Sequence, residues 1–301
     1  MGIILHKEPQ LGKPDLIASW PGIGNIGAIA INTLRGQLGA EEFGEIESWD
    51  FFYPRKVRIK AGVIEELEFP GNRFYYKRLE NKDLLFFIGE EQPTDGGRVY
   101  AEGGKAYEMA SLVLDVAQRF GCRRVYTSGA AVSLIHHTAK PRVWAVTSSE
   151  GLSREVKRHE NTILMSEIEG RGDQGSITGL NGLLLGLAKS RGFEAICLMG
   201  EIPDYLSGAP FPCPKASKAV LEVLTKLLEV QIEYRGLDEM AFQIDGIVNS
   251  IYDKLPQEIK EKIEQRVQPK PEAITEEDEK WMKEHIDELF KKGGREGEKP
   301  S

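Results

Sequence analysis

Short apolar runs alternate along the chain with longer segments in which apolar residues recur at helical spacing. The first run, at residues 15–20, has a proline on either side and precedes a glycine-rich turn and a helical segment at residues 28–39. Brief apolar runs bounded by turn residues are typical of buried strands. We predict further strands at residues 43–49, 83–90, 123–129, 142–147, 162–165 and 194–201. We predict further helices at residues 101–120, 149–159, 178–191, 215–230 and 238–267.

This order of elements predicts the fold class. Most of the strands are apolar along their whole length, and helices alternate with them, so we expect an α/β fold with a mainly parallel sheet that is covered on both faces. Residues 57–69 and 73–79 predict a hairpin around the Pro-Gly-Asn-Arg turn at residues 70–73.

Toward the C-terminus, the alternation of strands and helices gives way first to helical segments alone and then to a charge-dense tail. We predict a core domain at residues 1–235, a C-terminal helical extension at residues 236–267 and a charged, partly disordered tail at residues 268–301. In the tail, one more amphipathic helix is expected at residues 276–291. The extension carries an apolar stripe at helical spacing. Two interpretations of this stripe stay open, an oligomerisation surface or a face that covers the chain's own sheet.

Charge and hydropathy indicate which kinds of partner and which compartment to expect for this protein. The chain of 301 residues has 39 basic and 47 acidic side chains, a formal net charge of -8, which argues against general binding to nucleic acid or anionic membranes. It has no apolar run of the roughly 18 residues that a membrane-spanning helix needs, and no secretory signal at its N-terminus. Cys122, Cys197 and Cys213 are widely spaced and predict reduced thiols. We therefore expect a cytoplasmic protein with neither a nucleic-acid nor a membrane partner.

The glycine-rich turn lies between a predicted strand and a predicted helix. Gly22, Gly24 and Gly27 have the spacing of the dinucleotide fingerprint G-x-G-x-x-G, and the N–H groups of such a turn can bind an anion at a helix N-terminus. With Asn25 they form a candidate binding site for a nucleotide or another phosphate-bearing ligand. The alternative is structural, because glycines also permit a tight turn and close packing of a helix on a strand.

Two carboxylates extend this candidate site. Glu90 and Glu201 each follow a glycine near the end of a predicted strand, and ligands of open α/β sheets collect at the carboxyl ends of strands. If both face one crevice and one pKa is raised, the pair could perform acid–base chemistry. The alternative is that they bind backbone N–H groups or arginines. The polar loop at residues 167–176 also has two interpretations. It could act as a lid or bind a metal ion through its carboxylates, or it could be an ordinary solvated loop.

The sequence lacks a complete catalytic or metal-binding constellation. It contains no nucleophile elbow, no Walker A loop and no zinc-protease motif. His136 and His137 are adjacent, and adjacent side chains on a regular element point apart. We therefore predict no catalytic residue, no metal ligand and no cofactor. Whether the chain is an enzyme stays open, and a non-enzymatic role is the interpretation we favour.

Five sequence blocks occur in an informative order. They are W-P-G-I-G-N-I-G at residues 20–27, G-E-E-Q-P at 89–93, H-T-A-K-P-R-V at 137–143, T-G-L-N-G-L-L-L at 178–185, and G-E-I-P-D-Y at 200–205 followed by Pro210, Pro212 and Pro214-Lys215-Ala216. This ordered set, which runs from about residue 15 to residue 234, resembles the proteasome assembly chaperone 2 family.

The resemblance implies both a fold and a role. The fold is a three-layer α/β/α domain similar to that of purine nucleoside phosphorylases and peptidyl-tRNA hydrolase-like proteins, and the role includes self-association. Members in eukaryotes and archaea help to assemble the proteasome α ring, where a C-terminal tail of a hydrophobic residue, a tyrosine and any residue docks between α subunits. The sequence ends in Glu298-Lys299-Pro300-Ser301, so docking by such a tail is not expected.

Two functions from different classes follow. The first is a non-enzymatic, assembly-chaperone-like or interaction protein that forms homo-oligomers and binds a multi-subunit complex such as a proteasome. The alternative is a binding protein or enzyme for a nucleotide or phosphate-bearing ligand, held by residues 22–27 together with Glu90 and Glu201.

Overall fold

The computed structural model describes residues 2–94, 103–168 and 175–267. The helix predicted at residues 276–291, the tail at 268–301 and the centre of the loop at 167–176 lie outside these ranges. The chain divides into two compact units, Met1–Leu255 and Pro256–Ser301. Within the second unit the structure describes one helix, α7 (Gln257–Val267).

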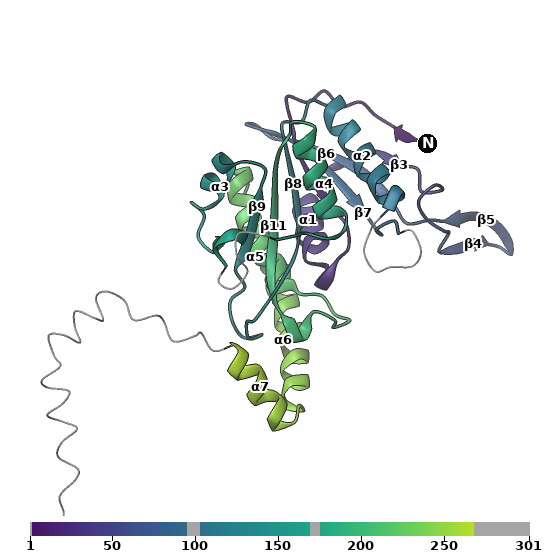
Figure 1. Cartoon of the computed structure of the whole chain (residues 1–301). Coiled ribbons are helices and arrows are strands. Elements are labelled where there is room, and N and C mark those ends of the chain that lie inside the picture. Colours follow the sequence, from purple (N-terminus) through teal and green to yellow (C-terminus); the bar gives the residue numbers. More distant parts are fainter. Residues whose placement is uncertain (1, 95–102, 169–174, 268–301) are drawn as a thin grey trace, which may run out of the picture. The chain divides into compact units, whose positions relative to one another are not determined.

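A mixed sheet forms the middle layer of the first unit (Figure 1). Its strands are β1 (Ile3–Leu5), β2 (Asp15–Ser19), β3 (Glu41–Ile46), β6 (Asn72–Arg78), β7 (Asp83–Gly89), β8 (Arg124–Ser133), β9 (Val143–Thr147), β10 (Thr162–Leu164) and β11 (Glu194–Pro203). Among the residues that the structure describes, these nine strands lie in the order β1-β3-β6-β7-β2-β8-β11-β9-β10.

The centre of the sheet is parallel and its margins contain antiparallel pairs. Strands β7, β2, β8 and β11 run parallel to one another, whereas β6 joins β7 and β9 joins β11 in antiparallel pairs. All five residues of β2 are buried, as expected for a strand covered on both faces. The predicted α/β class with a mainly parallel sheet is confirmed, and the antiparallel margins are an addition that the apolar pattern does not reveal.

Helices cover both faces of the sheet and make the three layers that the resemblance implies (Figure 1). On one face, α2 (Gly103–Arg119) and α4 (Gly179–Ser190) pack over a core that contains Trp20 and Phe87. On the other face, α1 (Ile26–Gln37), α3 (Glu150–Val156) and α5 (Pro214–Leu228) share a second core. Helix α6 (Arg235–Asp253) lies against α5 and buries Leu237, Ala241 and Val248.

The segment between β3 and β6 differs from the prediction. Strands β4 (Lys56–Lys60) and β5 (Val63–Glu68) pair with each other, and β6 pairs instead with β3 and β7. Ala61 and Gly62 connect β4 to β5 with φ angles of 49° and 80°, the two positive values that a type I′ turn requires. The predicted hairpin around residues 70–73 is therefore wrong, because the chain reverses earlier, within the segment predicted as its first strand.

The helix predicted at residues 238–267 is interrupted. α6 ends at Asp253, and α7 begins after Pro256, whose missing N–H and fixed φ disfavour a continuous helix. The division into a core at residues 1–235, an extension at 236–267 and a tail at 268–301 stays a prediction. No helix in the part of the chain that the structure describes combines the length and apolar character needed to cross a membrane.

Candidate functional site

The glycine-rich turn contacts the segment that leads into α5. Gly24 has a φ angle of 60°, and its carbonyl oxygen accepts a hydrogen bond of 2.8 Å from the backbone N–H of Cys213. A Cβ atom at Gly24 would lie 2.7 Å from Sγ of Cys213. Asn25, which precedes α1, has a φ angle of 50°, a left-handed conformation that asparagine tolerates better than most residues. Gly24 is thus required by the backbone conformation and by the close contact.

Gly27 and Gly22 occupy different environments. Gly27 is buried in the first turn of α1, where a Cβ atom would lie 2.7 Å from the backbone oxygen of Ser128 on β8. Gly22 is exposed, and a Cβ atom there would meet no atom within 4 Å. Packing therefore explains Gly24 and Gly27 without a ligand, whereas it does not explain Gly22.

A cavity of about 180 Å³, which we call the strand-end cavity, lies beside this turn. Strand β8 contributes residues from its carboxyl-terminal half, β11 contributes residues from its middle, and the segment that leads into α4 and the first turn of α4 contribute others. Its lining consists of Gly22, Ile23, Gln92, Gly129, Ala130, Ala131, Val132, Trp144, Met165, Ser176, Ile177, Thr178, Asn181, Cys197 and Met199. None of these side chains is charged, so the described lining offers a phosphate group no cation to pair with.

Two amide side chains contribute hydrogen-bonding groups to the strand-end cavity. The Gln92 side chain donates to the carbonyl oxygen of Pro21 at 2.6 Å and accepts from the backbone N–H of Leu180 at 3.0 Å, so it joins the turn to the start of α4. Asn181 is 8% exposed, and its Oδ1 has no hydrogen-bond partner among the described residues. A buried amide oxygen without a partner is costly, and a donor group in the cavity would satisfy it.

Gln92 and Asn181 are not among the site residues predicted from the sequence. Both lie inside blocks that resemble the family, G-E-E-Q-P and T-G-L-N-G-L-L-L. Each is a single amide side chain within an apolar or turn-forming block. Such a side chain needs hydrogen-bond partners when it is buried, and this feature could have identified both residues from the sequence.

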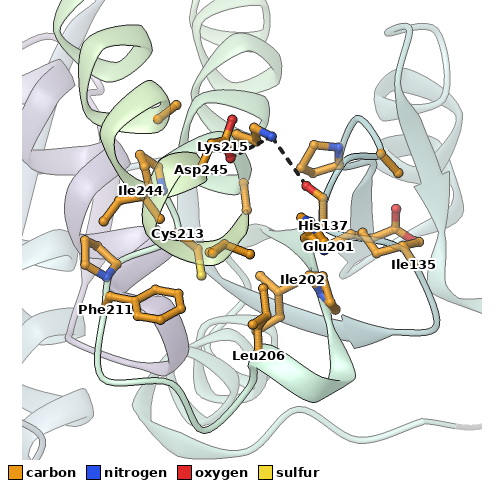
Figure 2. Close-up of a pocket in the computed structure, with 18 of the residues that line it drawn as sticks. Ile135, His137, Glu201, Ile202, Leu206, Phe211, Cys213, Lys215, Ile244 and Asp245 are labelled. Atoms are coloured by element: carbon orange, nitrogen blue, oxygen red, sulfur yellow. Dashed lines mark hydrogen bonds and ion pairs between the residues drawn. The ribbon is translucent and has the colours of Figure 1, made fainter. Parts of the chain in front are cut away.

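A second, smaller cavity of about 50 Å³, the α5–α6 cavity, lies between the start of α5, helix α6 and the loops after β8 and β11 (Figure 2). Ile202, Leu206 and Phe211 make one side of it apolar. Lys215 forms an ion pair of 2.7 Å with Asp245 of α6 and donates a hydrogen bond of 3.4 Å to the backbone oxygen of His137. Lys215 and Asp245, which both line this cavity, are therefore paired with each other.

Glu201 belongs to the buried interior of this region. It lies within β11, which continues to Pro203, and its side chain is 0% exposed. Oε2 accepts from the backbone N–H of Arg142 at 2.9 Å and from Arg142 Nε at 3.0 Å. Oε1 accepts from Arg142 Nη2 at 2.8 Å and from Nε1 of Trp144 at 2.8 Å. Burial by itself would raise the pKa of Glu201, but the bonds from Arg142 and Trp144 outweigh burial and lower it.

This arrangement makes Glu201 a fixed structural anion. A general base near neutral pH needs a raised pKa and an accessible oxygen atom, and Glu201 has neither. Of the two alternatives from the sequence, the contacts match the one in which the carboxylate binds a backbone N–H group and an arginine.

Glu90 occupies a different part of the molecule. It follows β7 and is exposed, with Oε2 at 2.9 Å from Arg55 Nη1, while the neighbouring Glu91 lies 2.6 Å from Arg55 Nε. Strands β2 and β8 lie between β7 and β11, which separates the strands of the two glutamates by roughly 14 Å at the usual strand spacing. The structure therefore does not bring Glu90 and Glu201 together. Ligand binding at Gly22, Gly24, Asn25, Gly27, Glu90 and Glu201 stays a prediction.

The adjacent histidines do not point apart, because they lie in the loop after β8 and not on a regular element. Their rings lie 4.1 Å apart. The Tyr205 hydroxyl accepts from the backbone N–H of His137 at 2.8 Å and lies 2.9 Å from its Nδ1, and Nε2 lies 3.0 Å from Oδ1 of Asn249. A neutral ring with its proton on Nε2 satisfies both contacts. Burial, followed by the neighbouring His136, lowers the pKa of His137. His137 thus links α6 to the loop.

Residues 2–94, 103–168 and 175–267 contain no group of three or more His, Cys, Asp or Glu side chains placed to hold a metal ion. Cys122, Cys197 and Cys213 are free thiols. Burial raises the pKa of Cys197 to about 11, so this thiol stays protonated and unreactive at neutral pH.

Comparison with known proteins places these features in a family context. The model of the PAC2 family matches residues 16–251. The chain is 32% identical over 238 residues to the uncharacterized protein MJ1210 of Methanocaldococcus jannaschii, an alignment that covers 78% of this chain and 82% of that protein.

Solved structures give the same context. PbaB of Pyrococcus furiosus, described as an archaeal proteasome activator, is 31% identical with a TM-score of 0.69, covering 83% of this chain and 98% of PbaB. PbaA of the same organism, described as an archaeal homolog of proteasome-assembly chaperone, is 23% identical with a TM-score of 0.62, covering 88% of this chain and 97% of PbaA. The likeness to PbaA concerns the fold alone.

The buried carboxylate of Glu201 generates a prediction about acid stability. Its folded-state pKa lies below the ordinary value of 4.5, so its stabilising effect is present above that pH and is lost as the pH falls through the folded-state pKa. Glu201→Gln should lower the free energy of unfolding at neutral pH by about 1–3 kcal/mol, because the amide meets donors with its own NH₂ group. Urea unfolding at pH 7 and over a series of pH values below 4.5 measures this effect. The wild-type chain should lose more stability on acidification than the variant, and parallel losses would contradict the assignment.

Proposed function

The chain belongs to the PAC2 family, and from this membership we propose that it is a non-enzymatic, assembly-chaperone-like protein that binds itself and a multi-subunit complex. The observation that carries the proposal is the similarity to PbaB, which reaches 31% identity and covers 98% of that activator. Homology to proteasome-assembly-chaperone-like proteins makes a proteasome the partner we propose, and the cytoplasm the compartment.

The state of the charged groups supports a binding role over catalysis. Glu201 accepts four hydrogen bonds from Arg142 and Trp144, and Lys215 is paired with Asp245. A catalytic acid or base is expected to have a pKa shifted toward neutrality and an open path to substrate. These groups instead hold loops and helices together, as a rigid binding scaffold requires.

Association with a proteasome is the outcome that this proposal predicts. The purified full-length chain is mixed with archaeal proteasome α subunits and, separately, with assembled core particles, and sedimentation velocity measures comigration. We expect the chain to comigrate with at least one of these species at physiological salt. An assembly-chaperone-like protein binds its partner directly, so the complex should form from the two purified components alone.

An unrelated protein of similar negative net charge serves as the control for nonspecific attraction. If the chain sediments independently of both proteasome species, or comigrates no more than the acidic control, the proposed partner is wrong.

A second candidate function is small-molecule binding in the strand-end cavity, and the unpaired Oδ1 of Asn181 favours it. The uncharged lining favours a compact neutral ligand with a hydrogen-bond donor, such as an amide or a nucleobase, over a phosphate-bearing ligand. Pockets of this kind are mostly apolar with a few placed polar groups that fix the orientation of the ligand, and Asn181 and Gln92 would be those groups here.

A thermal-shift screen of neutral heterocycles, amides and nucleotides tests this second function. A neutral ligand at about a hundred times its dissociation constant should stabilise the fold by about 2.7 kcal/mol. Asn181→Leu should weaken binding about tenfold or more by removing the acceptor, whereas Glu90→Gln, at an exposed site outside the cavity lining, should leave it unchanged. The candidate fails if no compound shifts the melting temperature, or if a hit binds Asn181→Leu as well as it binds the wild-type chain.

A further inference from the structure

Strands β2 and β8 separate before either of them ends. β2 pairs with residues 125–127 of β8 through residues 16–18, whereas its last residue, Ser19, pairs with β7 but with no described residue of β8. Strand β8 continues to Ser133 and stays paired with β11 along its whole length. In the described part of the chain, residues 128–131 of β8 therefore have no strand partner on the side of β2.

After β2 the chain follows β7 and leaves β8. The Trp20 ring lies 5.1 Å from the Phe87 ring of β7, and the carbonyl oxygen of Pro21 accepts its hydrogen bond from Gln92, which follows β7. The strand-end cavity is lined both by the turn between β2 and α1 and by β8. It therefore lies where β2 would continue beside β8.

The order of the strands reverses at this point of the sheet. From β2 the chain continues through α1 to β3, β6 and β7, which all lie on one side of β2. From β8 it continues to β9, β10 and β11, which lie on the other side. In open α/β sheets, the crevice at the carboxyl ends of two such strands is the usual place for a ligand, so the cavity occupies the position that the topology favours.

Small residues keep the space beside β8 open. Gly129, Ala130 and Ala131 line the cavity, and a Cβ atom at Gly129 would lie 3.9 Å from Nδ2 of Asn181. The Asn181 side chain therefore lies over the Gly129 backbone, and its buried Oδ1 has no hydrogen-bond partner among the described residues. A strand without a neighbour presents backbone N–H and C=O groups, so a ligand here would meet a strand edge on one side and a carboxamide on the other.

We propose that the strand-end cavity binds a small uncharged amide, a ligand with an N–H donor next to a C=O acceptor, in place of the missing continuation of β2. This ligand class rests on the small-molecule function proposed above for the same cavity. The groups that recognise the ligand are the edge of β8 and the side chain of Asn181.

Hydrogen bonding explains why the ligand is an amide. A strand pairs with its neighbours through peptide groups, each of which offers one N–H and one C=O, and an amide offers the same pair of groups. Its N–H supplies the donor that Oδ1 of Asn181 lacks, and its C=O can accept from a backbone N–H of β8. A carboxylate or phosphate would find no basic side chain in the described lining, so a neutral ligand fits and an anion does not.

Size favours a small molecule over a peptide. An engineered protein cavity of about 150 Å³ binds benzene, so the strand-end cavity of about 180 Å³ accommodates one six-membered ring with a small substituent. An extended peptide paired along residues 128–131 would span about 13 Å, which is longer than a single ring. A lactam ring and an aromatic carboxamide both have the required amide group at the required size.

Two amides of different structure serve as probes, the lactam δ-valerolactam and the primary carboxamide nicotinamide. Each is titrated into the isotope-labelled full chain, and the shifts of backbone amide signals in NMR spectra give the dissociation constant. N-methyl-δ-valerolactam and N,N-dimethylnicotinamide lack the N–H donor and are the matched controls. An acetylated and amidated trialanine represents an extended peptide.

At least one of the two amides should bind, with its largest shifts at residues 129–131, and loss of its N–H donor should weaken binding about tenfold or more. Gly129→Ala should weaken binding likewise, because its methyl group takes up space beside β8, while a distance of 3.9 Å from Asn181 is an ordinary contact that leaves the fold intact. Gly186→Ala, on α4 and outside the cavity lining, should bind as the wild-type chain does. Circular dichroism verifies the fold of each variant.

The amide assignment is wrong if the donor-free analogues bind as tightly as their parent amides, if Gly129→Ala binds as tightly as the wild-type chain, or if the alanine peptide binds more tightly than both amides. If neither amide binds, but a compound from the thermal-shift screen binds and loses affinity in Asn181→Leu, the ligand class is wrong while small-molecule binding in the cavity stands. If no compound of either set binds, both statements are overturned.

Discussion

The rest of the structure depends on a turn that three neighbouring segments contact at once. The turn between β2 and α1 accepts a hydrogen bond from the start of α5 at Gly24 and one from Gln92 at Pro21. At Gly27 it brings α1 against β8 with no space for a side chain. These contacts join the parallel centre of the sheet to both helical layers. Gly22 and Ile23 line the strand-end cavity and Cys213 lines the α5–α6 cavity, so these contacts set part of the wall of each.

Around this junction, several charged and polar side chains pair with other parts of the chain and hold its segments together. Glu201 fixes the segment at Arg142 to β11, and Lys215 fixes α5 to Asp245 of α6. His137 joins α6 to the loop after β8 as a neutral ring. A scaffold held in this way can present surfaces to other proteins, and exposed apolar side chains gather on the hairpin β4–β5.

Local sequence patterns predicted the elements of the core well. The strands β2 and β7 and the helices α1, α2, α4 and α5 all lie where apolar runs and helical spacing indicate them. The α/β class followed from their alternation. The hairpin did not, because the Ala61-Gly62 turn is a weaker signal than Pro-Gly-Asn at residues 70–72, and only the strand pairing decides between the two.

The site was less predictable because it depends on strand order. Nothing in the sequence places β2 and β8 between β7 and β11, so the separation of Glu90 from Glu201 could not be foreseen. The orphan oxygen of Asn181 depends on which side chains surround it after folding. The glycine spacing, in contrast, pointed to a real constraint, and the structure shows that packing accounts for two of its three glycines.

The central claim is that the turn at residues 21–27 is a packing junction, and paired glycine substitutions test it most directly. Gly24→Ala adds a Cβ atom 2.7 Å from Sγ of Cys213 at a φ angle of 60°, so it should lower the free energy of unfolding by about 1–3 kcal/mol in the absence of any ligand. Gly22→Ala adds one with no atom within 4 Å and should stay within about 0.5 kcal/mol of the wild-type chain. Equal stabilities of the two variants in urea unfolding would contradict the claim.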